Sequence, residues 1–163
     1  MRRLCDRRDL LRGAGGLLSA AVFVGASSCT QEARAYDMHV SRDAGCGCCH
    51  AWNEQMAQSG HFRTELENVA DMAALKRRLG VPEDLASCHT AVVEGFVIEG
   101  HVPAEEIVRL IETRPAGVSG LAVPGMPLGS PGMEAPDGAQ QPYEIIAFSA
   151  DGGRSVFARR PSA

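Results

Sequence analysis

The 163-residue sequence lacks an excess of positive charge. Its formal net charge is −4, and the first 35 residues hold six of the sixteen basic residues but only three of the twenty acidic ones. The other 128 residues therefore carry ten basic and seventeen acidic residues, a net charge of −7. The only basic run, Lys76-Arg77-Arg78, falls in a predicted helix, where we expect a solvated face. Because nucleic acid is bound through basic surfaces, this composition argues against a nucleic-acid partner.

The sequence also lacks a hydrophobic run long enough to cross a membrane. The apolar run Leu17 to Ala26 covers about ten residues, whereas a spanning helix needs roughly 20. It follows Arg7-Arg8, a twin-arginine pattern, and the two features together are typical of a signal peptide. Ala33-Arg34-Ala35 predicts cleavage after Ala35, while a lipid anchor on Cys29 is the less favoured alternative. We therefore expect residues 36–163 to form one periplasmic domain without a transmembrane span.

Cysteine pairs spread along the chain, the usual framework of small exported proteins, are absent as well. Two of the six cysteines, Cys5 and Cys29, belong to the predicted signal peptide. The other four are clustered, three of them in the motif "CGCCH" and one about forty residues later: Cys46, Cys48, Cys49 and Cys88. Disulfides between neighbouring cysteines close short loops and add little stability. The clustering favours a redox or metal site over stabilising cross-links.

The spacing of apolar residues predicts alternating strands and helices. Strands are expected at 38–40, 62–69, 90–93 and 96–98. Helices are expected from Cys48 to Gly60, after Asp71 and from Pro103 to Pro115. The order β-α-β-α-β-β-α is that of thioredoxin, so the predicted fold class is α/β with a thioredoxin-like core.

Two different segments follow this core. Residues 117–138 contain ten glycines and prolines in 22 positions, and we expect neither helix nor strand there. Residues 143–148 and 154–159 flank Ala-Asp-Gly-Gly and are expected to form a β-hairpin. The chain thus ends in a Gly/Pro/Met loop and a hairpin.

The predicted fold places the cysteines together. Cys46 and Cys49 form a C-x-x-C where the first strand meets the first helix, the position of the thioredoxin redox motif. Cys88 and His89 precede the third strand, and His89 stands where thioredoxins have a proline. In that fold the loop before the third strand packs against the C-x-x-C, so we expect Cys88 and His89 to face the other thiols.

Three further residues are candidate metal ligands. Met126 and Met133 occur in two Pro-Gly-Met repeats, where a thioether can either bind metal or pack as a lid. His101 follows Gly100 at a strand end and can reach the site or cap the next helix. The remaining histidines and methionines are expected to play no ligand role: His50 lies beside the cluster, His39 and His61 face solvent, and Met38, Met56 and Met72 belong to the core with Trp52.

Residue chemistry leaves metal binding and disulfide exchange open. Disulfide exchange needs only Cys46 as nucleophile and Cys49 as resolving thiol, so Cys48 is surplus. Cu(I) is soft and prefers thiolate, then thioether and imidazole, all of which occur here. Four thiols exceed the need of one ion, which predicts more than one copper ion with bridging thiolates. A zinc-stabilised thioredoxin-like adaptor is a third alternative, since zinc accepts Cys₃His sets.

Three motifs resemble the CopG-type copper-resistance family: Cys46-Gly-Cys-Cys, "LASCHTAVVEGFVIEGHVPAEEI" and "GLAVPGMPLGSPGME". The resemblance spans residues 36–160 and implies a periplasmic, thioredoxin-like protein that binds copper, with redox activity left open. We therefore predict a Cu(I) protein for copper tolerance, storage, transfer or copper redox, with other periplasmic copper-handling proteins as partners. The alternative is a thiol–disulfide oxidoreductase acting on exported cuproproteins. The predicted metal ligands are Cys46, Cys48, Cys49, Cys88, His89, His101, Met126 and Met133.

Overall fold

The computed structural model describes residues 35–160. Arg7-Arg8, Cys29 and most of the predicted signal peptide lie outside the described residues. Between residues 35 and 160, no helix is long and apolar enough to span a membrane. In chain order, the elements are β1 (Tyr36–Arg42), α1 (Gly47–Gln58), β2 (Phe62–Asn68), α2 (Met72–Arg78), a 3₁₀ turn (Glu83–Leu85), β3 (His89–Val93), β4 (Phe96–Glu99), α3 (Ala104–Thr113), β5 (Gly120–Ala122), β6 (Tyr143–Phe148) and β7 (Arg154–Arg160).

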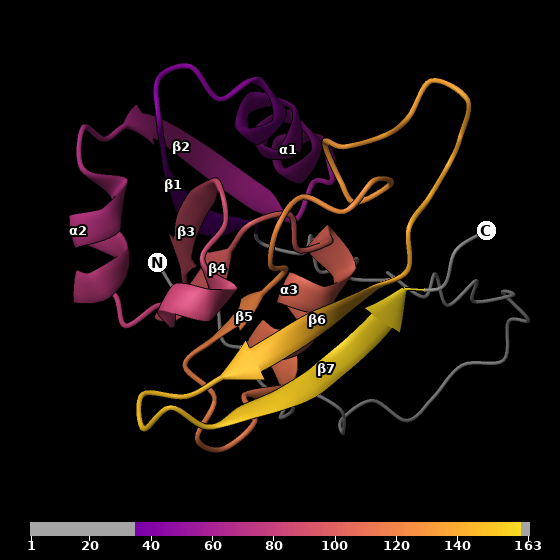
Figure 1. The fold of residues 1–163 in the computed structure, drawn as a ribbon. Coiled ribbons are helices and arrows are strands. Elements are labelled where there is room, and N and C mark those ends of the chain that lie inside the picture. Colours follow the sequence, from indigo (N-terminus) through magenta and orange to yellow (C-terminus); the bar gives the residue numbers. More distant parts are fainter. Residues whose placement is uncertain (1–34, 161–163) are drawn as a thin grey trace, which may run out of the picture. The chain divides into compact units, whose positions relative to one another are not determined.

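The seven strands of the described residues form one sheet in the order β2-β1-β3-β4-β5-β6-β7 (Figure 1). β1 pairs with β2 in parallel and with β3 in the antiparallel direction. β3 and β4 form a hairpin, and β5 runs parallel to β4. β6 and β7 form the antiparallel hairpin that extends the sheet at the far edge. The predicted α/β class and the order of the first seven elements are confirmed, while the likeness to thioredoxin stays a prediction.

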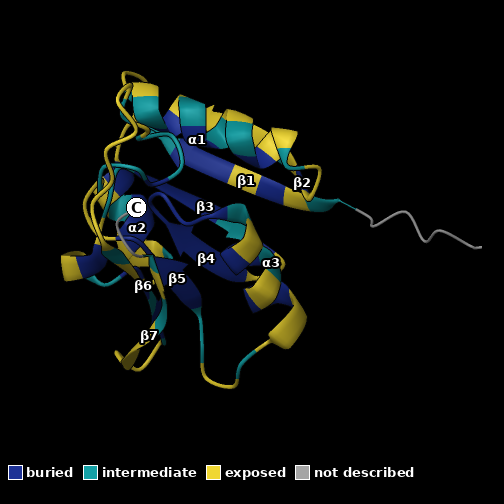
Figure 2. Cartoon of the chain, turned by 90° about the vertical axis from the view of Figure 1, so that its right-hand side faces the viewer, coloured by how far each residue is buried: buried dark blue, intermediate teal, exposed yellow. Residues whose placement is uncertain are grey.

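Two hydrophobic clusters lie on opposite faces of this sheet, because alternate residues of a strand point to opposite sides. One cluster joins Ile98 and Leu121 of the sheet to α1 and α3, through side chains such as Trp52 and Ile107. The other joins Val97, Ala122 and Phe148 to the segment after α2. Figure 2 shows α1 with its outer side exposed and its inner side buried against the sheet. The buried residues of α1 are Cys49, Trp52 and Met56, the spacing expected from the sequence.

The prediction of neither helix nor strand for residues 117–138 is wrong for Gly120–Ala122, which form β5. A three-residue strand rich in small side chains has no local signature, and its hydrogen-bond partners β4 and β6 lie far away in the sequence. A Cβ atom on Gly120 would lie 2.0 Å from the Val97 carbonyl oxygen. Gly120 therefore allows close strand approach rather than ending a strand.

The prediction of a solvated Lys76-Arg77-Arg78 face is wrong for Lys76. Arg77 and Arg78 are exposed, but Lys76 is buried and its Nζ forms an ion pair with the buried Glu99. A buried ammonium requires a partner of opposite charge, and this partner comes from β4, 23 residues away. Helix periodicity alone does not predict such a distant partner.

Candidate metal centre

The functional side chains lie at the side of the sheet where three strands end and a fourth begins. Because β3 runs antiparallel to β1 and β4, and β5 runs parallel to β4, the start of β3 lies beside the ends of the other three strands. Cys46 follows β1, Cys88 precedes β3, His101 follows β4 and Met126 follows β5. The topology therefore gathers residues that are up to 80 positions apart in the sequence.

Three cysteines lie at the N-terminus of α1. Cys46 is the N-cap residue, and its Sγ accepts a hydrogen bond from the Cys49 backbone N–H at 3.3 Å. Arg42 Nη1 donates to the Cys46 carbonyl oxygen at 2.6 Å. Cys46 and Cys49 are joined by a disulfide, and the Cys48 sulfur lies 3.6 Å from the Cys46 sulfur. Cys49 is buried, whereas Cys46 and Cys48 are partly exposed.

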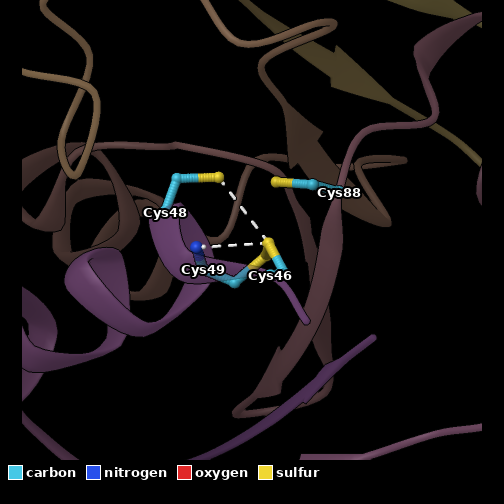
Figure 3. Close-up of side chains that lie close together, drawn as sticks. All are labelled: Cys46, Cys48, Cys49 and Cys88. Atoms are coloured by element: carbon cyan, nitrogen blue, oxygen red, sulfur yellow. Dashed lines mark hydrogen bonds between the residues drawn. A yellow bond between two sulfur atoms is a disulfide. The ribbon is translucent and has the colours of Figure 1, made fainter. Parts of the chain in front are cut away.

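Cys88 completes the cysteine cluster, which we define as Cys46, Cys48, Cys49 and Cys88. All four sulfur atoms lie within 4.8 Å of one another. Figure 3 shows the Cys88 side chain pointing from its own segment toward the end of α1. The expectation that Cys88 faces the other thiols is thus confirmed, and Cys48 and Cys88 are the free thiols of the described residues.

Two buried histidines form a second donor group around Cys88, here called the histidine group (Cys88, His89 and His101). Their ligand atoms also lie within 4.8 Å of one another. The Cys88 sulfur is 3.0 Å from His101 Nε2 and 3.4 Å from His89 Nδ1. His101 Nδ1 lies 2.7 Å from the Pro131 carbonyl oxygen, which can only accept a hydrogen bond. Nδ1 therefore carries the proton of His101, and the Nε2 lone pair faces Cys88.

Burial determines the protonation of this group. It lowers the pKa of His89 to about 3, with His101 and Lys76 as further causes. It also lowers the pKa of His101. Burial raises the pKa of Cys88 to about 12, and the neighbouring Cys48 adds to the shift. Near neutral pH both imidazoles are therefore neutral, and a metal that binds the Cys88 sulfur must displace its proton.

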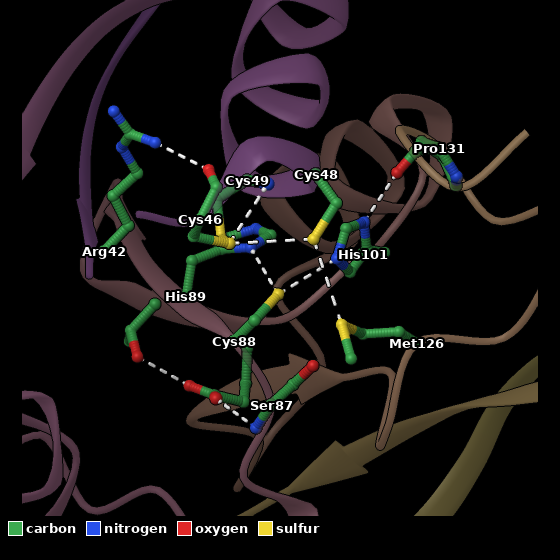
Figure 4. The surroundings of a disulfide bond; sticks show 12 residues. Arg42, Cys46, Cys48, Cys49, Ser87, Cys88, His89, His101, Met126 and Pro131 are labelled. Carbon is green, nitrogen blue, oxygen red and sulfur yellow. Dashed lines mark hydrogen bonds between the residues drawn. A yellow bond between two sulfur atoms is a disulfide. The ribbon is translucent and has the colours of Figure 1, made fainter. Parts of the chain in front are cut away.

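The loop between β5 and β6 lies beside these strand ends and is called the methionine loop (residues 123–142). Met126 Sδ lies 3.8 Å from Cys48 Sγ, and the Met126 side chain is 50% exposed (Figure 4). Gln55 of α1 donates a hydrogen bond to Glu134 of the loop at 2.8 Å. Met133 is half-buried, and no cluster thiol of the described residues hydrogen-bonds to its sulfur. The structure therefore brings Met126 to the cysteine cluster, whereas the described residues show no hydrogen bond between the cluster and Met133.

The other histidines lie where the sequence places them. His50 is exposed on α1 and pairs with Glu54 at 3.3 Å. His39 is exposed and pairs with Glu65 at 3.1 Å. His61 is exposed too. The methionines expected in the core, Met38, Met56 and Met72, are all buried, as is Trp52.

The sequence did not predict the buried polar residues that hold the segment around Cys88. Glu99 is buried and accepts hydrogen bonds from Lys76, from the Ser87 backbone N–H and from Thr90. Arg42, which holds the Cys46 carbonyl, was missed as well. The one available signal was the acidic residue at the end of the apolar run Phe96–Glu99, which does not identify its partners.

The donor set fits a soft metal ion. Thiolate, thioether and imidazole are the ligands that Cu(I) prefers, and the described residues place four sulfurs of cysteine, one of methionine and two imidazoles together. Imidazole and thiolate also suit zinc, so the donor types alone allow either ion. The number of donors exceeds the four that one tetrahedral ion uses.

Comparisons with known proteins agree with a metal-related role. A family model described as "Protein of unknown function, DUF411" matches residues 85–133, which include Cys88, His89, His101, Met126 and Met133. Two solved structures of copper resistance protein CopG, designated Form 1 and Form 2, are each 44% identical to this chain with a TM-score of 0.72. Each covers 78% of this chain, and the match includes 99% and 100% of those chains. A comparison with curated proteins finds no match.

Proposed function

The chain belongs to the CopG copper-resistance family, and from this premise we propose that it is a periplasmic protein that binds Cu(I) in a multinuclear thiolate site. The observation that carries the proposal is the sharing of Cys88 by two donor groups, the cysteine cluster and the histidine group. A thiolate common to two groups is suited to bridge two ions. Bridging between two ions would therefore explain why the site holds more cysteines than one ion needs.

Each donor has a distinct part in this proposal. Cys46, Cys48, Cys49 and Cys88 supply thiolates, which dominate the affinity for Cu(I). His89 and His101 supply neutral nitrogen donors, because burial keeps both imidazoles unprotonated. Met126 supplies a thioether that no physiological pH protonates and that does not form disulfides. Met133, further along the loop, stays a predicted ligand.

Copper binding by Cys46 and Cys49 requires reduction of their disulfide. Two electrons and two protons convert the disulfide into two thiols, and a dithiol reductant that becomes a disulfide supplies them. Metal binding then releases the thiol protons. Loading of the full site is therefore coupled to the supply of dithiol, while Cys48 and Cys88 are free in the oxidised protein.

Copper exchange is expected at the Met126 side of the site. Met126 is 50% exposed, whereas His89, His101 and Cys49 are buried. A copper donor or acceptor in the periplasm would therefore reach Cys48 and Met126 first. Copper tolerance follows from this chemistry, since ions held by several thiolates are withdrawn from other proteins.

The Cys48→Ser variant tests the proposal. The reduced protein, purified without oxygen, is titrated with Cu(I), and copper content and thiolate-to-copper absorption are measured with a zinc titration alongside. We expect more than one copper per parent chain, and less copper with an altered spectrum for Cys48→Ser. His50→Ala, which changes an exposed neighbour of the cluster, is the matched control and should equal the parent. Equal copper and equal spectra for Cys48→Ser and the parent would contradict a multinuclear cluster.

One observation favours a second function, thiol–disulfide exchange. The Cys46–Cys49 disulfide lies at a helix N-terminus with Cys46 partly exposed and Cys49 buried. A substrate thiolate would attack the Cys46 sulfur and release Cys49; a second substrate thiolate then frees Cys46, leaving the substrate oxidised and the protein reduced.

Metal-free turnover separates the two functions. If exchange is the function, the metal-free protein also runs this step in reverse, and an added dithiol that becomes a disulfide drives the reduction of insulin through Cys46 and Cys49. Cys46→Ser then abolishes insulin reduction, while Cys48→Ser keeps it. If copper binding is the function, we expect weak turnover from the parent itself. Metal-free rates comparable to those of a thioredoxin would favour exchange over the copper proposal.

A further inference from the structure

A buried carboxylate contacts the segment that carries Cys88. Glu99, the last residue of β4, is fully buried. Its Oε1 accepts hydrogen bonds from Lys76 Nζ at 2.5 Å and from the Ser87 backbone N–H at 2.6 Å. Its Oε2 accepts from Thr90 Oγ1 at 2.6 Å, and Lys76 Nζ also donates to Thr90 Oγ1 at 2.9 Å. The carboxylate therefore holds both residues that flank Cys88 and His89.

The same network reaches the methionine loop. Ser87 Oγ donates a hydrogen bond to the Gly125 carbonyl oxygen at 2.6 Å, and Gly125 directly precedes Met126. A Cβ atom on Gly100 would lie 2.6 Å from both Ser87 Oγ and the Val123 carbonyl oxygen. The three segments are thus packed without space between them. A displacement of Ser87 would move Cys88 through the backbone and Met126 through Gly125.

Stability alone is a weak reason for such a network. Removing two charges from water is costly, and well-packed apolar residues often replace a buried ion pair without loss of stability. What apolar residues do not provide is a fixed acceptor for the Ser87 N–H. The orientation of that acceptor determines where Cys88 and the start of the methionine loop lie.

We propose that Glu99, paired with Lys76, is a positioning residue that holds Cys88 and Met126 toward Cys48 before copper arrives. The inference rests on the proposed copper function and names residues outside the set of ligands. Cys88 and Met126 come from separate segments, yet the Cys48 sulfur lies within 4.8 Å of the Cys88 sulfur and 3.8 Å from the Met126 sulfur. Ordering these donors in advance lowers the entropy that metal binding must overcome.

Two double variants separate positioning from stabilisation. Lys76→Met with Glu99→Gln removes both charges but keeps an amide oxygen that can accept from the Ser87 N–H. Lys76→Met with Glu99→Leu removes the charges and the acceptor. Both lack the ion pair, so they differ mainly in the polar contacts of residue 99 with Ser87 and Thr90, the residues that flank Cys88 and His89. Urea unfolding of each metal-free protein, with its disulfide intact, reports stability separately.

The readouts are the thiolate-to-copper absorption spectrum and the rate of Cu(I) transfer to a chelator. We expect the Gln double variant to match the parent spectrum and to transfer copper within about twofold of the parent rate. The Leu double variant should transfer copper about tenfold faster, with an altered spectrum. A folded Leu double variant with the spectrum and transfer rate of the parent overturns the inference.

Ser87→Ala gives a second test that does not disturb the buried charges. It keeps the N–H donor to Glu99 and removes the hydroxyl that holds Gly125. We expect faster copper transfer than in the parent, equal to that of Met126→Leu, and no further increase in the double variant Ser87→Ala with Met126→Leu. Additive increases would show that Ser87 does not act through Met126 and would overturn that part of the inference.

The parent distinguishes this inference from the proposed function. A reduced parent that binds no copper overturns both. A parent that binds copper with thiolate absorption, while both Ser87→Ala and the Leu double variant behave like it, overturns the positioning inference alone. Met133→Leu is the comparison variant for the loop. Met133 stays a predicted ligand, but its sulfur makes no hydrogen bond to the cluster within the described residues, so we expect it to change transfer less than Met126→Leu.

Discussion

At the residue scale, burial decides the chemistry of the donors. His89 and His101 are fully buried, and both have lowered pKa values. The sulfur of Cys88 lies between them and the other thiols, in a medium that disfavours its charged form. Because Cys88, His89 and His101 are neutral near pH 7, the metal-free protein buries no negative charge at these three donors. The same burial makes folding depend on pH.

The free energy of unfolding of the metal-free protein should fall as pH decreases from 7 to 4. The pKa of His89 is about 3 in the folded protein and near 6.5 when unperturbed, so folding favours the neutral ring. Its contribution is complete above pH 6.5 and is lost as pH falls toward 3. The slope within this window is at most about 1.4 kcal/mol per pH unit for one such group. Urea unfolding at several pH values, with the disulfide intact, measures it.

The His89→Gln variant isolates this contribution from that of the carboxylates. We expect its unfolding free energy to depend less steeply on pH than that of the parent between pH 6.5 and 4. His61→Gln, which changes an exposed histidine, should keep the parent slope. Parallel profiles for His89→Gln and the parent would mean that His89 does not fold in its neutral form.

At the element scale, the contact between α1 and the methionine loop brings two distant segments together. Gly132 has a φ of +80°, and a Cβ atom there would lie 2.7 Å from the Trp52 backbone nitrogen and 2.8 Å from the Cys48 carbonyl oxygen. The neighbouring Pro131 carbonyl accepts the hydrogen bond from His101. Only glycine lets the loop approach the helix this closely.

Gly132→Ala should separate the loop from α1. We expect a loss of unfolding free energy of roughly 2–4 kcal/mol, because a left-handed alanine costs about 1–2 kcal/mol and the clash with helix backbone adds to it. Gly138→Ala is the matched control, since Gly138 has a φ of +76° but open space around its Cβ position. Copper transfer to a chelator should be faster for Gly132→Ala alone. Equal stability and transfer rates for the two variants would contradict the proposed contact.

At the scale of the whole molecule, the predicted export signal would determine in which compartment the proposed copper site is loaded. The described residues hold four cysteines, two with free thiols and two in a disulfide. The periplasm is oxidising, so an exported protein needs protection or re-reduction of such thiols. Twin-arginine export carries folded chains, which would allow the site to form before it leaves the cytoplasm.

Replacing Arg7 and Arg8 together by Lys should trap the precursor in the cytoplasm. The twin-arginine signal is predicted from this pair, and lysine keeps the positive charge of each arginine. Cell fractionation followed by immunoblotting measures the distribution. Arg2→Lys with Arg3→Lys preserves the pair and should be exported like the parent. Unchanged periplasmic accumulation of the Arg7/Arg8 variant would show that the general secretion route suffices and that copper is acquired outside.

The sequence by itself determined the local features of this protein. Covalent adjacency places Cys46, Cys48 and Cys49 together in any fold, and apolar periodicity predicted α1 and the β3–β4 hairpin. The turn of that hairpin, Glu94-Gly95, adopts positive φ at both residues, a conformation that glycine favours at Gly95. Such features depend on neighbours within a few positions, which is why they can be predicted without tertiary structure.

Only the tertiary structure decided which distant residues meet. Strand pairing, not local composition, makes Gly120–Ala122 a strand. The burial of Lys76 depends on Glu99, 23 residues away, and the contact between Cys48 and Met126 depends on how the methionine loop packs against α1. These contacts arise from the register of strands and the packing of loops. They join residues far apart in the sequence, and a local pattern does not identify such residue pairs.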